Sequence, residues 1–450
     1  MSVGEILSIA MFGTLVLCLF SGFPVAFVIG GIGVIFGLLG WSLDYFSLIE
    51  FFNLVPRIWG QTAENLILVA IPCFIFMGIM LEKSRVAADL LDVLAILLRR
   101  VPGGLALAVT LLGGIMAAST GIIGASVVMM TLMAMPTMLR HGYDKGLACG
   151  TIASSATLGI LIPPSIMLVM MGDLLSISVG RLFLTAILPG LLLLSLYSIF
   201  VIGLAWFRPH LAPSVVEEEE IPRRDLYIRC LRALMAPVAL IVAVLGSIFG
   251  GLATPTEAAG VGAFGAILLA AFNRRLTWGV TREVCENSAL TIGMIFMIMI
   301  GATVFSYVFR SLGGEAMIVD ALTDMGIGAW GTLLVLMGVV FLLGFFFDWI
   351  EITLIVLPIF GPVVAGLDFG DHVRSTEVIY WFAAMMAVNL QTSFLTPPFG
   401  MALFFVHGAA KGSIHMQHLY RGIVPFVGLQ LAGLAAVMIW PEIALWLQRP

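Results

Sequence analysis

The sequence predicts an all-α polytopic membrane protein built as an inverted repeat, with two re-entrant hairpins and two broken helices. Three observations lead to this fold class: the composition, a polar break between two matching halves, and a Pro-Pro pair at the same place in each half. The 450-residue chain is 61% hydrophobic and 10% charged, and its mean hydropathy is +1.13. Such values are typical of helical proteins that cross a lipid bilayer several times.

Composition also excludes several function classes. The net charge is -5, and the absence of a basic face argues against nucleic acid as a partner. The glycine-rich run Gly30-Gly31-Ile32-Gly33 follows no strand, and the sequence contains no Walker motif, so no nucleotide cofactor is expected. The five cysteines are scattered without metal-ligand spacing, which favours roles in packing.

The polar break divides the chain into two repeats. Residues 208–229 contain the run Glu217 to Glu220 and are predicted to form a cytoplasmic linker between residues 1–207 and 230–450. Apolar segments match across the linker: 4–21 with 230–250, 23–40 with 256–272, 62–82 with 288–309, 103–139 with 330–367, 146–172 with 377–409, and 182–207 with 423–446. Shorter amphipathic pieces suited to the membrane interface also match: 41–60 with 273–287, and 84–100 with 311–327.

Two of the apolar segments are too long to be single spans. Residues 103–139 and 330–367 would each make a straight helix of roughly 55 Å, against a hydrocarbon core of about 30 Å. Each is therefore predicted to fold back near mid-membrane as a re-entrant hairpin, with its turn at 118–126 or 347–353.

The next segment in each repeat is predicted to be a broken helix. Residues 146–172 contain Pro163-Pro164, and residues 377–409 contain Pro397-Pro398. Proline removes a backbone donor and its ring clashes with the preceding turn, so carbonyl groups lose their helical partners. Such breaks at corresponding places in two repeats are typical of the binding sites of secondary transporters.

Positive charges predict the orientation. If Arg140 and Lys145 beside the first hairpin are cytoplasmic, alternation places the linker, Arg274 and Lys411 on the same side, and Asp371 after the second hairpin on the other. The repeats are then inserted with opposite polarity. This gives ten spans, two hairpins and periplasmic termini.

The first hairpin turn is rich in hydroxyl groups. Hydroxyl and carbonyl oxygens without a nearby carboxylate suit a weakly bound alkali cation at the end of half-helices. The alternative is that small residues simply allow helices to approach closely. The candidates are Ser119, Thr120, Gly121 and Ser126 on the hairpin, and Ser154, Ser155, Thr157 and the carbonyls from Gly159 to Ile162 on the facing break.

The second turn carries acids instead. Asp348 and Glu351 have no Lys or Arg within their segment, and an acid at mid-membrane costs roughly 2.5–3.5 kcal/mol. A sodium ion bound by Asp348 together with Thr392 and Ser393 would offset this cost. The alternative is a protonated Asp348 that holds the hairpin turn by hydrogen bonds, while Glu351 faces an aqueous cavity.

These motifs resemble the large membrane subunit of the tripartite ATP-independent periplasmic (TRAP) transporters, the DctM-like family. The resemblance covers essentially the whole chain. Its most specific pieces are Gly159-Ile160-Leu161-Ile162-Pro163-Pro164-Ser165, the stretch from Ser178 to Gly190, and Leu395-Thr396-Pro397-Pro398. The hairpins and breaks also look like those of divalent-anion sodium symporters, within the broader ion transporter superfamily.

The resemblance implies two or more transported sodium ions, each held between a hairpin tip and the facing break. It assigns Ser119, Thr120, Gly121, Thr157 and Gly159 to sodium site 1, and Asp348, Thr392 and Ser393 to sodium site 2. The substrate cavity between them draws its candidates from Ser126, Ser154, Ser165, Glu351 and Asn389. It further implies a periplasmic substrate-binding protein and a small four-span membrane subunit, expected as a separate chain.

The sequence therefore predicts a sodium-driven importer of a small organic anion in the bacterial inner membrane, working as an elevator. The alternative is a stand-alone ion or anion exchanger on the same scaffold without a binding protein. An enzyme is not expected, because an intramembrane hydrolase needs a nucleophile with a base or paired acids from separate segments.

Overall fold

The computed structural model describes residues 2–84, 86–120, 123–214, 223–397, 400–410 and 412–449. Every regular element within these ranges is helical, as the sequence predicts. Before the linker, the helices are α1 (Val3–Leu19), α2 (Val25–Ser42), α3 (Leu48–Thr62), η1 (Leu66–Val69), α4 (Ala70–Lys83), α5 (Val86–Leu98), α6 (Gly104–Thr120), α7 (Ile123–Arg140), α8 (Lys145–Thr157), η2 (Leu158–Ile160), α9 (Ile166–Leu174), α10 (Val179–Phe207) and η3 (Pro209–Leu211).

The second half of the chain is also helical. Its helices are α11 (Arg223–Phe249), α12 (Pro255–Phe272), α13 (Trp278–Ser311), α14 (Gly314–Asp324), α15 (Gly328–Leu343), α16 (Trp349–Ala365), α17 (Val378–Ser393), α18 (Met401–Ala409), α19 (Met416–Ile439), α20 (Glu442–Leu445) and η4 (Trp446–Gln448).

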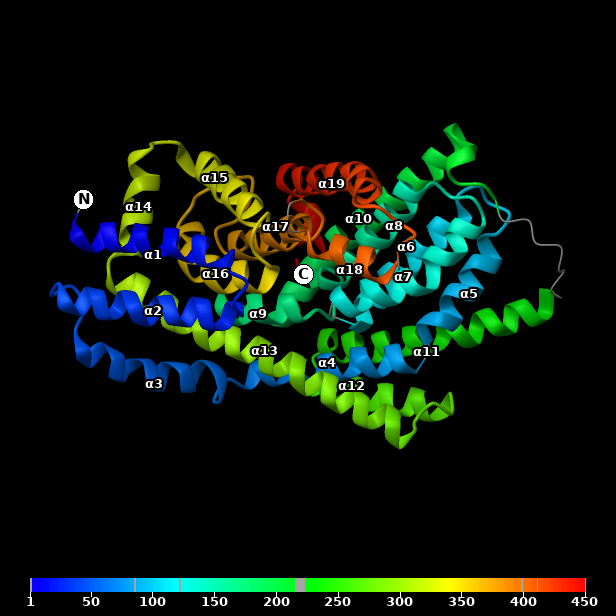
Figure 1. The fold of residues 1–450 in the computed structure, drawn as a ribbon, viewed down its shortest axis with the longest axis horizontal. Helices are drawn as coiled ribbons and strands as arrows, with labels where there is room; N and C mark the ends of the chain where they lie inside the picture. The colour runs from blue at the N-terminus through cyan, green and yellow to red at the C-terminus, as the bar shows by residue number, and fades with distance from the viewer. Residues whose placement is uncertain are drawn as a thin grey trace.

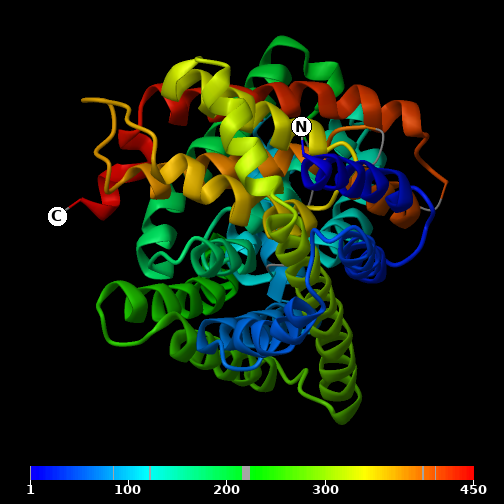
Figure 2. The same cartoon turned by 90° about the vertical axis from the view of Figure 1, so that its left-hand side faces the viewer.

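The helices form two layers, which Figure 1 shows one above the other. The lower layer contains α2, α3, α4, α11, α12 and α13, in which α2 packs on α13 and α4 on α12. The upper layer contains α6 to α10 and α15 to α19, so both hairpins and both broken helices lie in it. Figure 2 shows the same separation from the side, with α12 and the first part of α13 below.

By length and composition, six of the described helices are able to cross a membrane: α2, the segment Leu66–Lys83, α10, α12, α13 and α19. Six further apolar helical segments are shorter, and those of the two predicted hairpins, on α6, α7, α15 and α16, are among them. A short apolar helix followed by a turn is what a re-entrant segment requires, because its backbone must be enclosed by protein where it stops. The chain is a multi-pass membrane protein.

Both long apolar segments are divided into two helices. The first turn falls between α6 and α7, within the predicted range 118–126. The second turn is shifted from its prediction of 347–353, because α15 ends at Leu343 and α16 begins at Trp349. Asp348 caps α16 and Glu351 completes the capping box, so the residues after Asp348 are helical rather than part of the turn.

Two other boundaries differ from the prediction. Residues 273–287 were expected as a separate interfacial piece, but most of them form the start of α13, a continuous helix of 34 residues. The change from polar to apolar side chains there is not accompanied by a proline or a turn, so the backbone continues. The linker 208–229 is also shorter than predicted, because α11 already begins at Arg223.

One end of the molecule gathers segments that the charge pattern places in the cytoplasm. The backbone N–H of Asp144, before α8, donates to the carbonyl of Leu211 in η3 (2.9 Å). Lys83 at the end of α4 pairs with Glu283 in the first turns of α13 (2.6 Å). The second contact joins the two predicted repeats, while the orientation in the membrane stays a prediction.

Candidate functional site

In the first broken helix, a side-chain hydroxyl group replaces a backbone donor that the helix has lost. From Gly146 to Thr157, every residue of α8 is buried, and Gly159 is buried in η2. After the Pro163-Pro164 pair, Ser165 is the N-cap of α9, and its hydroxyl donates to the carbonyl of Ile160. Ser165 therefore stabilises the break itself, and its assignment to the substrate cavity stays a prediction.

The hydroxyl groups on α8 divide into two kinds. Thr157 donates to the carbonyl of Ser154 (2.8 Å), and Ser154 to the carbonyl of Gly150 (2.6 Å). By contrast, the buried hydroxyls of Thr151 and Ser155 have no hydrogen-bond partner among the described residues. A buried hydroxyl without a partner is costly, so these oxygens are available to a ligand.

The first hairpin lies directly against this broken helix. A Cβ atom built on Gly113 of α6 would lie 2.5 Å from the carbonyl oxygen of Ser155, so only glycine permits the observed approach. Ser126, on the second arm, is buried. Ser119 and Thr120 fall in the last turn of α6, but their side chains, like residue Gly121, lie outside the described part of the chain. Their assignment to sodium site 1 stays a prediction.

The second broken helix has its own set of unpartnered polar atoms. Asn389 of α17 donates to the carbonyl of Met337 on hairpin helix α15 (2.8 Å), which joins the break to the hairpin. Its Oδ1, both polar side-chain atoms of Gln391, and the hydroxyl of Thr353 on α16 are buried without partners among the described residues. α17 ends at Ser393 ahead of Pro397, whereas Pro398 lies outside the described residues.

The second hairpin tip meets this break at Ser393. A Cβ atom on Gly344 would lie 2.6 Å from the Cβ of Ser393, so the tip and the helix end are in van der Waals contact. Asp348 follows four residues later. Its Oδ1 accepts from the N–H of Trp349 (2.7 Å), and Glu351, which is buried, accepts from the N–H of Asp348 (3.1 Å).

The structure brings the tip and the break of sodium site 2 together but does not join the three predicted ligands by hydrogen bonds. In the described part of the chain, Thr392 and Ser393 donate to the carbonyls of Asn389 and Leu390 on their own helix. The hydrogen bonds of Asp348 likewise remain within the capping box. Asp348 and Glu351 thus cap α16, and their assignments to sodium site 2 and to the substrate cavity stay predictions.

The two breaks lie in one block of helices. α16 packs on α9, and α17 contacts both α9 and η2. On the other side, α18 packs on hairpin helix α7, where a Cβ on Gly124 would lie 3.0 Å from the ring of Phe405. Each repeat therefore contacts the hairpin or break of the other, and the oxygen-rich breaks are neighbours.

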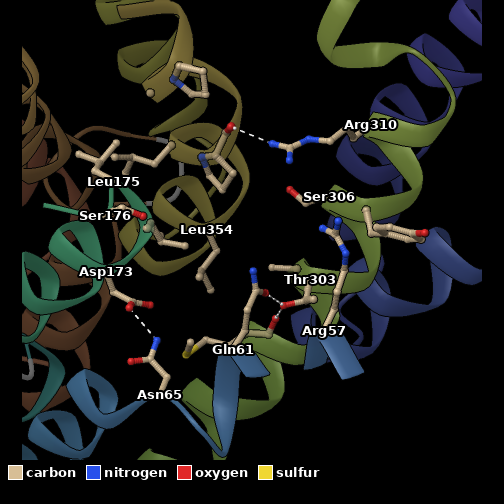
Figure 3. A pocket seen from close by; sticks show the side chains of 18 of the residues that line it. Arg57, Gln61, Asn65, Asp173, Leu175, Ser176, Thr303, Ser306, Arg310 and Leu354 are labelled. Atoms are coloured by element: carbon tan, nitrogen blue, oxygen red, sulfur yellow. Dashed lines mark hydrogen bonds between the residues drawn. The ribbon is translucent and has the colours of Figure 1, made fainter. Parts of the chain in front are cut away.

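A cavity of about 600 Å³ opens between the two layers, beside the break of the first repeat. One wall is formed by α3 and α13 and the other by α16 and the end of α9. Figure 3 shows Arg57, Thr303 and Ser306 on one side and Asp173, Ser176 and Leu354 on the other.

The cavity wall holds two arginines with different partners. Arg310 pairs with Glu315 (2.5 Å) and donates to the carbonyl of Pro358 on α16 (3.4 Å). Arg57 instead lies over the ring of Tyr307, 4.7 Å from its centroid. Across the cavity, Asn65 donates to Asp173 (2.6 Å).

The sequence analysis missed both arginines. Arg57 falls in the piece 41–60 that was assigned to the membrane interface, where a single arginine usually anchors a helix to lipid head groups. Its neighbour Tyr307 is 250 positions further along the chain, so only the fold reveals that Arg57 lines a cavity. The Pro56-Arg57 pair inside an amphipathic helix was the available signal, and it is weak.

The fold is similar to that of a solved protein. The chain superposes on the YdaH transporter of Alcanivorax borkumensis with a TM-score of 0.62, covering 89% of this chain and 90% of the other, at 13% sequence identity. At this identity, the similarity concerns the fold alone.

The family is defined by sequence. A family model described as the tripartite ATP-independent periplasmic transporter, DctM component, matches residues 12–443. The chain belongs to this family. It is 31% identical over 390 residues to the C4-dicarboxylate TRAP transporter large permease protein DctM of Pseudomonas aeruginosa, covering 86% of this chain and 87% of that protein.

Other relatives are named for different solutes. The C4-dicarboxylate TRAP transporter large permease protein DctM of Vibrio cholerae is 28% identical over 450 residues, covering 95% of this chain and 94% of that protein. The isethionate TRAP transporter permease protein DctMQ of Oleidesulfovibrio alaskensis is 29% identical over 447 residues, covering 97% of this chain and 65% of that protein. These relatives are named as transporter permeases rather than enzymes.

Proposed function

We propose that the chain is the large permease subunit of a sodium-coupled importer of a small organic acid. One observation carries the proposal: each broken helix contacts a hairpin and contains buried oxygen atoms that have no hydrogen-bond partner among the described residues. These atoms include the hydroxyls of Thr151 and Ser155 in one repeat and Asn389 Oδ1 and Gln391 Oε1 in the other. Oxygen ligands without excess charge suit a sodium ion that must be released again.

Sodium site 1 would use Thr157 and the carbonyls near Gly159, together with Ser119, Thr120 and Gly121 from the hairpin. Sodium site 2 would use Thr392, Ser393 and the carboxylate of Asp348, whose position is fixed by the capping box. Sodium is cargo here, and each positive charge that enters adds about 2.3 kcal/mol of drive for every 100 mV of membrane potential.

The two layers support an elevator mechanism. Hairpins and broken helices of both repeats pack on one another in the upper layer, which would move as a unit against the lower layer. Among the described residues, the hydrogen bonds from Asn65 to Asp173 and from Arg310 to the carbonyl of Pro358 join the two layers. Both bonds would have to break as the upper layer moves against the lower one.

The partners follow from the family. A periplasmic substrate-binding protein would deliver the acid, and a small four-span subunit would assemble with this chain in the bacterial inner membrane. The names of the relatives, which cover C4-dicarboxylates and isethionate, support a small organic anion as the solute.

Uptake by the reconstituted complex tests the proposal. The chain and the small subunit are incorporated into vesicles, and the binding protein is added with the ligand that stabilises it most in a thermal-shift screen of organic acids. We expect uptake only with an inward sodium gradient and with the binding protein present. Equal uptake in potassium would contradict sodium coupling, and uptake without the binding protein would favour the stand-alone exchanger.

A further inference from the structure

We propose that the cavity between α3, α13, α9 and α16 is a binding site for a small organic carboxylate, in which Arg57 holds the carboxylate group. This inference rests on the proposed function, because it identifies a second place where the transported acid, or one like it, binds. The cavity is separate from both hairpin tips and is lined mainly by residues of the interface between the layers.

The charges on the wall formed by α3 and α13 favour an anion. On that wall Arg310 pairs with Glu315, whereas Asp173 lies on the opposite wall, where it accepts a hydrogen bond from Asn65. Arg57 makes no ion pair within the described part of the chain, and its contact with Tyr307 leaves the charge uncompensated. The guanidinium group presents several N–H donors in one plane, which matches the two oxygens of a carboxylate.

Neutral polar groups lie beside Arg57. Gln61 and Thr303 share a hydrogen bond of 2.8 Å, and Ser306 on α13 also lines the cavity. Figure 3 shows Ser306 and Arg57 directed from the same wall into the same space. A hydroxyl and an amide next to a guanidinium group can bind a second oxygen of the ligand, for example a hydroxyl or another carboxylate.

The part of the opposite wall that α16 forms is apolar. Leu354, Leu357 and Pro358 of α16 face the arginine side of the cavity, as Figure 3 shows for Leu354. At about 600 Å³, the volume falls within the range of roughly 300–1,000 Å³ that is usual for small-molecule sites. The guanidinium group of Arg57 on one wall and the apolar side chains of α16 on the other suit a ligand with a compact carbon skeleton and an acid group at one end.

The site depends on both layers. Arg57 and Ser306 belong to the lower layer, whereas the apolar wall belongs to α16 of the upper layer. A ligand that touches both walls stabilises the arrangement of the layers seen here, because any relative movement separates its contacts. Binding of the carboxylate would thus favour the conformation of the transporter seen here over other conformations.

Chemical modification of arginine tests the site without requiring transport. The wild-type chain in phosphatidylcholine nanodiscs is treated with phenylglyoxal, which reacts with accessible guanidinium groups, and modified peptides are quantified by mass spectrometry. Acetate, succinate and gluconate are added in turn, with neutral succinamide and matched ionic strength as controls. Arg374, exposed in the loop before α17, is the internal reference.

We expect at least one of the three carboxylates, and not succinamide, to lower the modification of Arg57 about tenfold relative to Arg374. Equal responses of Arg57 and Arg374 to all three acids would overturn the proposal. A lipid head group is the other source of an anion, so the experiment is repeated with phosphatidylglycerol in the nanodiscs. Protection of Arg57 by that lipid alone, without any effect of the acids, would assign the guanidinium group to lipid and also overturn the proposal.

Uptake by variants separates this inference from the proposed function. Arg57→Gln is expected to raise the substrate concentration for half-maximal uptake several-fold, while the half-saturating sodium concentration stays unchanged and Arg57→Lys recovers part of the loss. Protection of Arg57 in a chain whose uptake ignores sodium would contradict the proposed function alone. Sodium-dependent uptake without any protection would contradict the anion site alone.

Discussion

The two hairpins make similar contacts but differ in chemistry. Each lies against a broken helix through a glycine, Gly113 in the middle of α6 at Ser155, and Gly344 at the second tip at Ser393. The described oxygens of the first break are neutral, whereas the second tip carries Asp348 and Glu351 in a capping box. If both tips bind sodium as proposed, one site would be built from neutral oxygens and the other would include a carboxylate.

The difference predicts unequal contributions to ion binding. A carboxylate interacts with a cation more strongly than a single neutral oxygen, especially where water is excluded. A hydroxyl at the first site is one of several similar ligands, so its removal leaves most of the site in place. The charged tip should therefore make the larger contribution to the sodium affinity, and each oxygen at the neutral tip should make a smaller one.

Asp348→Asn is expected to have the largest effect. Asparagine is also a good N-cap, so α16 should still begin at the same place and the protein should still assemble. Because the charge is lost, the half-saturating sodium concentration for uptake should rise more than tenfold, or uptake should disappear. Asp371→Asn, in the exposed loop after the second hairpin, is the matched control and should behave as wild type. Unchanged sodium dependence in Asp348→Asn would make the acid purely structural.

Gly344→Ala is expected to have the next largest effect. The added methyl group would lie 2.6 Å from the Cβ of Ser393, so the hairpin tip must move away from the broken helix. Overpacking of this kind costs about 1–3 kcal/mol, which should lower both the melting temperature and the sodium affinity. Gly338→Ala, on the same helix α15, meets no atom within 4 Å and should be neutral or stabilising. Similar melting temperatures for the two variants would contradict the close contact.

Thr157→Val is expected to have the smallest effect. Valine keeps the shape of the side chain but removes a hydroxyl that donates to the carbonyl of Ser154. With one of several neutral ligands missing, the half-saturating sodium concentration should rise no more than about threefold, which corresponds to less than about 1 kcal/mol. An effect as large as that of Asp348→Asn would contradict the proposal that the two sites contribute unequally to sodium affinity.

The sequence predicted the hairpins and breaks because covalent properties determine them. A proline pair cannot continue a helix, and about 37 apolar residues cannot form one straight span in a bilayer of about 30 Å. The position of the second turn was less predictable, because the capping box of Asp348 and Glu351, which starts α16 at Trp349, was not considered. Asp348, which was predicted to be energetically costly within the membrane, lies just after Gly344, the residue of the tip that contacts Ser393.

The cavity was beyond sequence reasoning for a different reason. Arg57 resembles any interfacial arginine until Tyr307 and α16 are placed beside it. The long helix α13 was also divided in the prediction, because a change of polarity was taken for a change of direction. Patterns along the chain thus predicted the helices, whereas contacts between distant segments determine which charged side chains line the cavity.

Direct measurement of sodium binding tests the central claim most simply. Thermal unfolding of the purified complex is followed as sodium replaces potassium at constant ionic strength, for wild type, Thr157→Val and Asp348→Asn. A ligand at 100 times its dissociation constant stabilises the folded state by about 2.7 kcal/mol. We predict that sodium raises the melting temperature of wild type, raises that of Thr157→Val by a similar or slightly smaller amount, and raises that of Asp348→Asn least. Equal stabilisation of wild type and Asp348→Asn would contradict a sodium site at the acidic tip.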